Sequence, residues 1–156
     1  MTPDWSLDLG IAPEGAAARL SAAINKRKKR AFGVLKTENE YVGFVGDPEF
    51  EIWERQKRAI HAVGQIRGRR GGTRLEVSFV IPLRTRILIV VFFVLYALAA
   101  MGIALQPPQT DISLAELAVS GVGAVVLAVT FGMAALGQRA DLRAFIERTY
   151  AEVSRI

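Results

Sequence analysis

The chain of 156 residues contains no cysteine and a single histidine, His61. The absence of cysteine excludes disulfides, thiol chemistry and cysteine-ligated metals. One imidazole with carboxylates alone is a poor ligand set for a transition metal, so we expect neither a metal nor a cofactor. No Gly-x-Ser-x-Gly motif marks a nucleophile, and no catalytic residue is predicted. These absences favour a protein that is not an enzyme.

Charged residues are missing from two long stretches in the second half of the chain. Residues 87–105 run 19 positions without a charge, and residues 117–137 run 21. A helix rises about 1.5 Å per residue, so each stretch can cross a hydrocarbon core about 30 Å thick. The loop between them, residues 106–116, is short and contains two prolines. The pattern predicts a transmembrane helical hairpin.

Lysine and arginine are absent from this hairpin. Residues 1–86 hold 16 basic and 10 acidic side chains, a net charge of +6, whereas the connecting loop is −2 and the tail after Gly137 is +1. Basic residues flanking membrane spans stay on the cytosolic side. We therefore expect a multi-pass protein of the cell membrane with both termini in the cytosol. The same rule accounts for the basic excess, so no nucleic acid is expected as a partner.

Residues 1–10 contain Asp4 and Asp8 and no apolar core, which is unlike a signal peptide. We expect an irregular segment over residues 1–12, docked through Trp5. A helix should follow, because Pro13 suits a first turn. Its apolar residues recur at four-residue spacing: Ala16, Leu20 and Ile24. We expect this helix to end in the basic run from Lys26 to Arg30, since cations favour the negative end of the helix dipole.

The segment between residues 31 and 81 has the two-residue period of strands. In its clearest part, Leu75, Val77 and Phe79 alternate with polar residues. Short strands joined by turns rich in glycine, asparagine and aspartate favour an antiparallel meander. Trp53 falls on the presumed outer face, either as an interface or buried beneath the N-terminal arm or the last helix. Strands are predicted for residues 32–36, 41–45, 49–55, 59–66 and 73–81.

The last segment, residues 138–156, is predicted to form an amphipathic helix that packs on the sheet. Its apolar face contains Leu142, Phe145, Ile146, Thr149, Val153 and Ile156. The predicted fold is an α+β membrane protein: a small antiparallel β-meander with flanking helices and an inserted transmembrane hairpin. Three parts are expected, a cytosolic helix with strands (residues 1–86), the hairpin (residues 87–137) and the cytosolic closing helix (residues 138–156).

Short glycine-containing segments give the chain a resemblance to a loose group of uncharacterised small bacterial membrane proteins. The segments are Phe44-Val45-Gly46, Phe50-Glu51-Ile52, Gly64-Gln65-Ile66 and the run from Gly71 to Val77, followed by the apolar hairpin. Members of this group have a β-rich cytosolic part, two spans and a closing helix, which the resemblance implies for most of residues 13–156. It implies no activity. Members carry an Asn-Ser-Phe-like segment where this chain has Arg58-Ala59-Ile60-His61, so no role of that segment is carried over.

Two clusters of basic residues are candidates for binding anionic lipid head groups. The simpler interpretation is that they only fix the orientation of the spans. A third basic cluster, residues 67–74, includes Gly71-Gly72 but lacks the Lys-Ser/Thr end of a P-loop, so it is interpreted as a hairpin turn. The candidate head-group residues are Lys26, Arg27, Lys28, Lys29, Arg30, Arg84 and Arg86.

The second apolar stretch carries a ridge of small residues at four-residue spacing: Ser120, Ala124, Ala128 and Gly132. Small residues at this spacing allow close approach of helices in lipid. One interpretation is contact with the first span, through Ala97, Ala100 and Ala104, and the other is a homo-oligomer.

The lone His61 has two interpretations. An imidazole near neutral pH can act as an acid or base if a carboxylate orients it. The nearby carboxylates are Asp47, Glu49, Glu51 and Glu54. The simpler interpretation is an ordinary strand residue.

The leading hypothesis for function is a non-enzymatic, membrane-anchored binding module. A curved sheet closed by a helix can hold an apolar cavity, and basic residues at its rim would orient a lipid or other amphiphile at the cytosolic leaflet. The alternative is a structural or interaction protein that forms a homo-oligomer through the ridge of small residues. Membrane lipids are the expected partners, and the sequence names no protein partner.

Overall fold

The computed structural model describes residues 3–26, 40–104 and 114–154. The chain divides into two compact units. The α+β unit contains Met1–Ile81 and Gly137–Ile156, and the hairpin unit contains Pro82–Leu136. The α+β unit is therefore assembled from two stretches that are far apart in the sequence, with the hairpin unit inserted between them.

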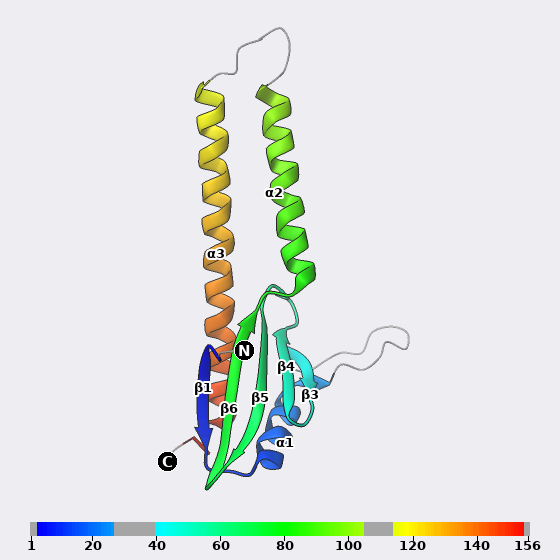
Figure 1. The fold of residues 1–156 in the computed structure, drawn as a ribbon, viewed down its shortest axis with the longest axis vertical. Helices are drawn as coiled ribbons and strands as arrows, with labels where there is room; N and C mark the ends of the chain where they lie inside the picture. Colours follow the sequence, from blue (N-terminus) through cyan, green and yellow to red (C-terminus); the bar gives the residue numbers. More distant parts are fainter. Residues whose placement is uncertain (1–2, 27–39, 105–113, 155–156) are drawn as a thin grey trace, which may run out of the picture. The chain divides into compact units, whose positions relative to one another are not determined.

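The α+β unit is built on a six-stranded sheet with the strand order β1-β6-β5-β4-β3-β2 (Figure 1). Each neighbouring pair among β1, β6, β5, β4 and β3 is antiparallel, whereas β2 pairs with β3 in parallel. The meander predicted from residue 41 onward is confirmed, whereas the strand predicted at residues 32–36 lies outside the described residues. The strands are β1 (Trp5–Leu9), β2 (Asn25–Lys26), β3 (Tyr41–Val45), β4 (Glu49–Glu54), β5 (His61–Arg69) and β6 (Gly72–Val80).

The strand β1 corrects the irregular segment expected at the start of the chain. It lies at the edge of the sheet and pairs antiparallel with β6, so that Leu7 stands opposite Leu75. Leu9 is buried, whereas Ser6 and Asp8 are exposed. A two-residue alternation of apolar and polar side chains is therefore present, and it turns one side of β1 toward the core.

The helix α1 (Pro13–Ala23) begins at its proline as predicted, but it ends before the basic run. Ile24 has extended dihedral angles, and Asn25–Lys26 then pairs with β3. The predicted helical end at Lys26 to Arg30 is therefore wrong for Lys26, whose backbone forms hydrogen bonds at the sheet edge. Residues 27–30 lie outside the described part of the chain.

The core lies on one face of the sheet, which α1 and the last turns of α3 (Leu114–Tyr150) cover. The predicted apolar stripe of α1 is fully inside it, since Leu20 has no exposed surface. Tyr41 of β3 stacks on Phe145 of α3 with ring centroids 4.0 Å apart. The largest fully buried side chains are Tyr150, Phe50, Leu20, Ile52, Ile60, Leu75, Leu142 and Ile146.

The closing helix differs from the prediction in its bounds. The chain forms one continuous helix, α3, in place of a span followed by a separate helix. It ends at Tyr150, where the amides of Val153 and Ser154 donate to the Tyr150 carbonyl oxygen. In its last turns, Leu142 and Ile146 are buried and Phe145 stacks on Tyr41 of β3.

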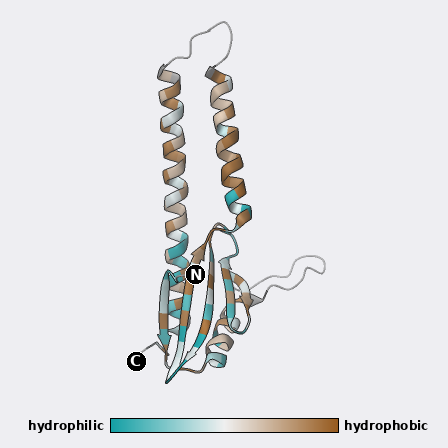
Figure 2. Ribbon diagram, in the orientation of Figure 1, coloured by the Kyte–Doolittle hydropathy of each residue, from teal (hydrophilic) through white to brown (hydrophobic). Residues whose placement is uncertain are grey.

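The hairpin unit consists of α2 (Leu83–Ala104) and the first part of α3. Two helical segments are long and apolar enough to cross a membrane, Leu83–Ile103 with a mean hydropathy of 2.5 and a second window within Leu117–Tyr150 with 2.1. Figure 2, in which the ribbon is coloured by hydropathy, shows hydrophobic residues along both helices. None of the residues in these windows is buried.

Tyr150 joins the closing helix to α1, and its removal tests the core. Its hydroxyl donates to the Ala16 carbonyl oxygen at 2.7 Å, and burial raises its pKa well above the ordinary value of 10.0. We expect Tyr150→Phe to lower the free energy of unfolding of the full chain in detergent by about 1 kcal/mol at neutral pH.

The same variant tests the pH dependence. Above pH 10 the unfolded chain loses the Tyr150 proton while the folded chain keeps it, so the wild-type protein should lose stability as the pH rises further. Tyr150→Phe should lose less over the same range, measured by denaturant unfolding between neutral pH and pH values above 10. Equal losses in both chains would contradict this role of Tyr150.

Candidate functional site

The candidate head-group residues fall into three groups in the structure. Arg84 and Arg86 lie in the first turns of α2 and are exposed. Lys26 is placed only by its backbone in β2, and the rest of its cluster lies outside the described residues. The structure therefore presents one basic pair at the beginning of the first apolar helix.

The two helices of the hairpin unit meet through aromatic and small residues. The Tyr96 hydroxyl donates to the Ser120 carbonyl oxygen at 2.8 Å. A side chain at Gly123 would collide with the Tyr96 hydroxyl. Phe93 also contacts Phe131, with ring centroids 6.3 Å apart. Gly123 therefore provides the space in which the tyrosine reaches the neighbouring backbone.

The ridge of small residues is divided by this contact. Ser120 and Ala124 are half-buried, whereas Ala128 and Gly132 are exposed in the single chain. A Cβ atom added at Gly132 would meet no atom within 4 Å. Ala128 and Gly132, the second half of the ridge, are thus accessible within the hairpin unit.

His61 lies on the face of the sheet opposite the core, and β-pairing selects its carboxylate partner. Its Nδ1 atom is 2.6 Å from Glu51 Oε1. Trp53 pairs with His61 in the register and stacks on the imidazole at a centroid distance of 4.7 Å. Trp53 is 7% exposed, so it is buried rather than presented as an open interface. The cluster orients an imidazole, but His61 already contacts both Glu51 and Trp53.

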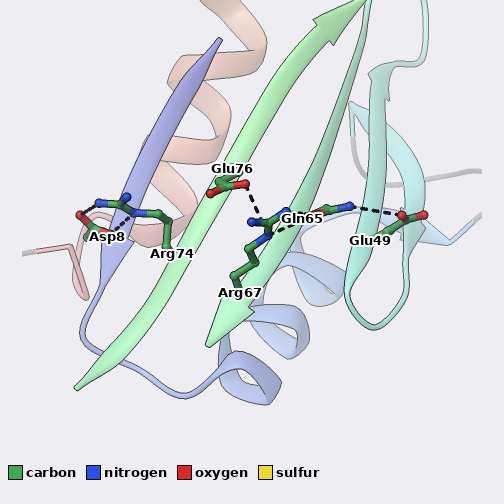
Figure 3. Close-up of polar contacts among 6 residues, drawn as sticks. All are labelled: Asp8, Glu49, Gln65, Arg67, Arg74 and Glu76. Carbon is green, nitrogen blue, oxygen red and sulfur yellow. Dashed lines mark hydrogen bonds and ion pairs between the residues drawn. The ribbon is translucent and has the colours of Figure 1, made fainter. Parts of the chain in front are cut away.

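A network of polar side chains crosses four strands on the same face (Figure 3). Arg74 of β6 donates twice to Asp8 of β1, at 2.8 and 3.0 Å. The hydrogen bond from Arg74 lowers the pKa of Asp8 below its ordinary value. On β5, Arg67 donates to Gln65 and lies 3.5 Å from Glu76. These groups satisfy one another, so the network fixes strand register and leaves little capacity for a ligand.

Beside the core, the α+β unit contains a groove of about 620 Å³. Its walls come from α1, from the turn between β3 and β4 and from the end of β5. Such a volume is typical of sites for small ligands or side chains of a partner. The lining residues are Pro13, Glu14, Ala17, Ala18, Ser21, Val45, Gly46, Asp47, Ile66 and Gly68.

Small residues create this groove, and among the residues that the structure describes its charged lining residues are both acidic. Ala17 and Ala18 leave the side of α1 open, and a Cβ atom at Gly68 would lie 3.3 Å from the Pro13 ring. Glu14 and Asp47 are both exposed. Among the residues that the structure describes, neither carboxylate has an ion-pair partner. The groove therefore favours a cation with an apolar stem.

Sequence reasoning missed this groove. Its residues come from three segments, and only the pairing of β4 with β5 brings the turn at Asp47 beside Gly68. The small residues of α1 and β5 were visible, but small residues alone do not distinguish a groove from close packing. Gly68, at the groove, pairs with Thr73, which lies seven residues before Val80, the last residue of β6. Along β6 this separation is about 23 Å at about 3.3 Å per residue.

Comparison with protein families, with curated proteins and with solved structures gives no match. The resemblance to small two-span bacterial proteins remains a prediction. The function must therefore be inferred from the chemistry of the groove, the charges and the apolar helices.

Two glycines that are two residues apart on α3 but differ in their surroundings test the packing of the hairpin unit. At Gly123 the Cβ atom of a leucine would collide with the Tyr96 hydroxyl, whereas at Gly121 a Cβ atom would meet no atom within 4 Å. Both changes raise helix propensity equally. We expect Gly123→Leu to be less stable than Gly121→Leu by about 1–3 kcal/mol, measured by unfolding in detergent followed by circular dichroism. Equal stabilities would show that Tyr96 does not hold the two helices together.

Proposed function

We propose that the chain is a two-span integral membrane protein of the cell membrane whose α+β unit is a non-enzymatic binding module on the cytosolic side. The groove beside α1 is its binding site, and the ligand is an amphiphile that presents a positive charge. The observation that carries this proposal is the groove itself, in which Glu14 and Asp47 are the charged residues among the described lining.

The exposure of the apolar helices supports membrane insertion. A core helix of a soluble protein is covered by its own chain, whereas none of the residues in the two apolar windows is buried. Hydrocarbon would cover these side chains. Arg84 and Arg86 begin the first helix, where basic residues interact with anionic head groups and stay in the cytosol.

The core contains residues from before and after the hairpin in the sequence, which supports placing both termini on the same side of the membrane. Leu142, Ile146 and Tyr150, which follow the second span, are buried in the unit that contains the strands preceding the first span. A chain that crosses the membrane must return before this core can form, which requires an even number of crossings. Two apolar helices satisfy this requirement.

The lack of native cysteine makes the topology directly testable. Single cysteines introduced by Gln109→Cys, Gln56→Cys and Ala151→Cys report on the connecting loop, the strand region and the end of α3. We expect a membrane-impermeant maleimide to label intact cells only at position 109. Positions 56 and 151 should react only after the membrane is permeabilised. Labelling of either of these two in intact cells would contradict the proposed orientation.

The groove is tested with octamethylenediamine, an aliphatic chain with an ammonium group at each end. We expect the full chain in detergent to bind it, and Glu14→Gln combined with Asp47→Asn to weaken binding about tenfold, since two ion pairs are lost. Calorimetric titration measures the affinity. The control variant combines Asp141→Asn with Glu152→Gln, two exposed carboxylates outside the groove. If wild type and both variants bind equally, the groove is not the site.

Self-association through the ridge is the second candidate. Ala128 and Gly132 are exposed in the single chain, and Gly132 has open space around it. Small residues with free space let a second helix approach closely in lipid. In that case the membrane spans, rather than the α+β unit, would specify the oligomer.

A further inference from the structure

One side of α1 lines the groove with a single charge and otherwise small side chains. Its four groove residues recur at spacings of three and four positions, so they lie side by side along about two turns of the helix: Glu14, Ala17, Ala18 and Ser21. The neighbouring stripe, which includes Leu20, is buried in the core. α1 therefore turns one stripe to the core and leaves the next one on the groove, with Glu14 in its first turn.

Asp47 reaches the groove from a different element, the turn between β3 and β4. The Gly46 amide donates to the Glu49 carbonyl oxygen at 2.8 Å, which closes this turn. The Ile66 amide donates to the Pro48 carbonyl oxygen at 2.7 Å, which ties the turn to β5. Asp47 lies between the two residues that are held in this way, and its side chain is exposed. Backbone hydrogen bonds thus hold Asp47 at the groove and leave its carboxylate accessible to a ligand.

The rest of the described lining is almost entirely apolar. Ile66 is 4% exposed, and Ala17 and Val45 are half-buried. Among the described lining residues, Ser21 contributes the one hydroxyl group. A methylene chain buries apolar area on such a surface and gives up no hydrogen bond to water, whereas a polar chain would lose several. The groove therefore favours an aliphatic stem.

A single ammonium group does not match the charge of the groove. Neither Glu14 nor Asp47 forms an ion pair with another residue of the described chain, and the described lining contains no basic residue. One positive group would neutralise one carboxylate and leave the other without a partner. A ligand with two positive groups neutralises both. Because the two carboxylates come from separate elements, each can hold a group of its own.

We infer that the ligand of the groove is an aliphatic diamine that is protonated at both ends, with one ammonium group on Glu14 and the other on Asp47. Its methylene stem lies along Ala17 and Val45. Simple alkyl amines titrate near the pKa of lysine, about 10.4, so both ends are charged at neutral pH. This inference rests on the proposed binding role of the groove, and it narrows the ligand to an amphiphile with a positive charge at each end.

Three probes of equal length test the second charge: octamethylenediamine, aminooctanol, in which a hydroxyl replaces one ammonium group, and octanediol, in which hydroxyls replace both. Calorimetric titration of the full chain in an uncharged detergent at low ionic strength measures the affinities. We expect the diamine to bind about fivefold more tightly than aminooctanol, and aminooctanol more tightly than the diol, since each ammonium group adds one exposed ion pair. Added salt should reduce both differences.

Single substitutions locate the two ammonium groups. With Glu14→Gln or with Asp47→Asn, one carboxylate remains, so the second ammonium group has no partner. The preference for the diamine over aminooctanol should then fall below about twofold in each variant. The matched control is Asp141→Asn, which removes an exposed carboxylate outside the groove and should keep the full preference. Circular dichroism verifies that each variant is folded.

A series of diamines tests whether the two ends bind at separate points. From tetramethylenediamine to decamethylenediamine, the preference over the matching amino alcohol should be greatest at one length, because the fold fixes the separation of the two carboxylates. No preference at any length would overturn the inference.

The remaining outcomes distinguish the inference from the proposed function. If the diamine and aminooctanol bind the wild type equally, and Glu14→Gln combined with Asp47→Asn weakens both, the groove binds one cation and the inference is wrong. A preference for the diamine that persists in both single variants would also contradict it, because the second ammonium group would then pair elsewhere. If no probe binds, or if the double substitution leaves binding unchanged, the groove is not the site and the proposed function is wrong as well.

Discussion

The packing of the last turns of α3 against the sheet is the contact on which the rest of the molecule depends. Leu142, Ile146 and Tyr150 fill the core that the strands and α1 leave open, and they are almost completely inaccessible to solvent. They follow the hairpin in the sequence, so the core is incomplete until the chain has passed through both apolar helices. Folding of the α+β unit and formation of the hairpin are therefore coupled by connectivity.

The elements whose apolar residues recur with a clear period were predictable from the sequence. This period arises because one side of a helix or strand is buried. The four-residue stripe of α1 and the alternation along β6 correspond to buried residues in the structure. β1 was missed, although Trp5, Leu7 and Leu9 alternate with polar residues. Five residues of alternation are too few to identify a strand without the β6 edge that pairs with it. The predicted end of α1 was wrong for a related reason, because pairing of Asn25–Lys26 with β3 at the sheet edge competes with a further helical turn.

The candidate sites depended on register, which the sequence does not contain. Four carboxylates were possible partners of His61, and the pairing of β4 with β5 brings Glu51 to it. The groove required the same pairing, because it joins α1 to a turn and to a strand end. The charges of Glu14 and Asp47 were visible, but nothing near them in the sequence indicated that they line one surface.

The distribution of satisfied and unsatisfied charges separates structural from binding surfaces. On the open face of the sheet, Asp8, Arg74, Arg67 and Glu76 neutralise one another (Figure 3). Such exposed pairs contribute little to stability but disfavour shifted registers. At the groove, by contrast, Glu14 and Asp47 have no ion-pair partner among the residues that the structure describes.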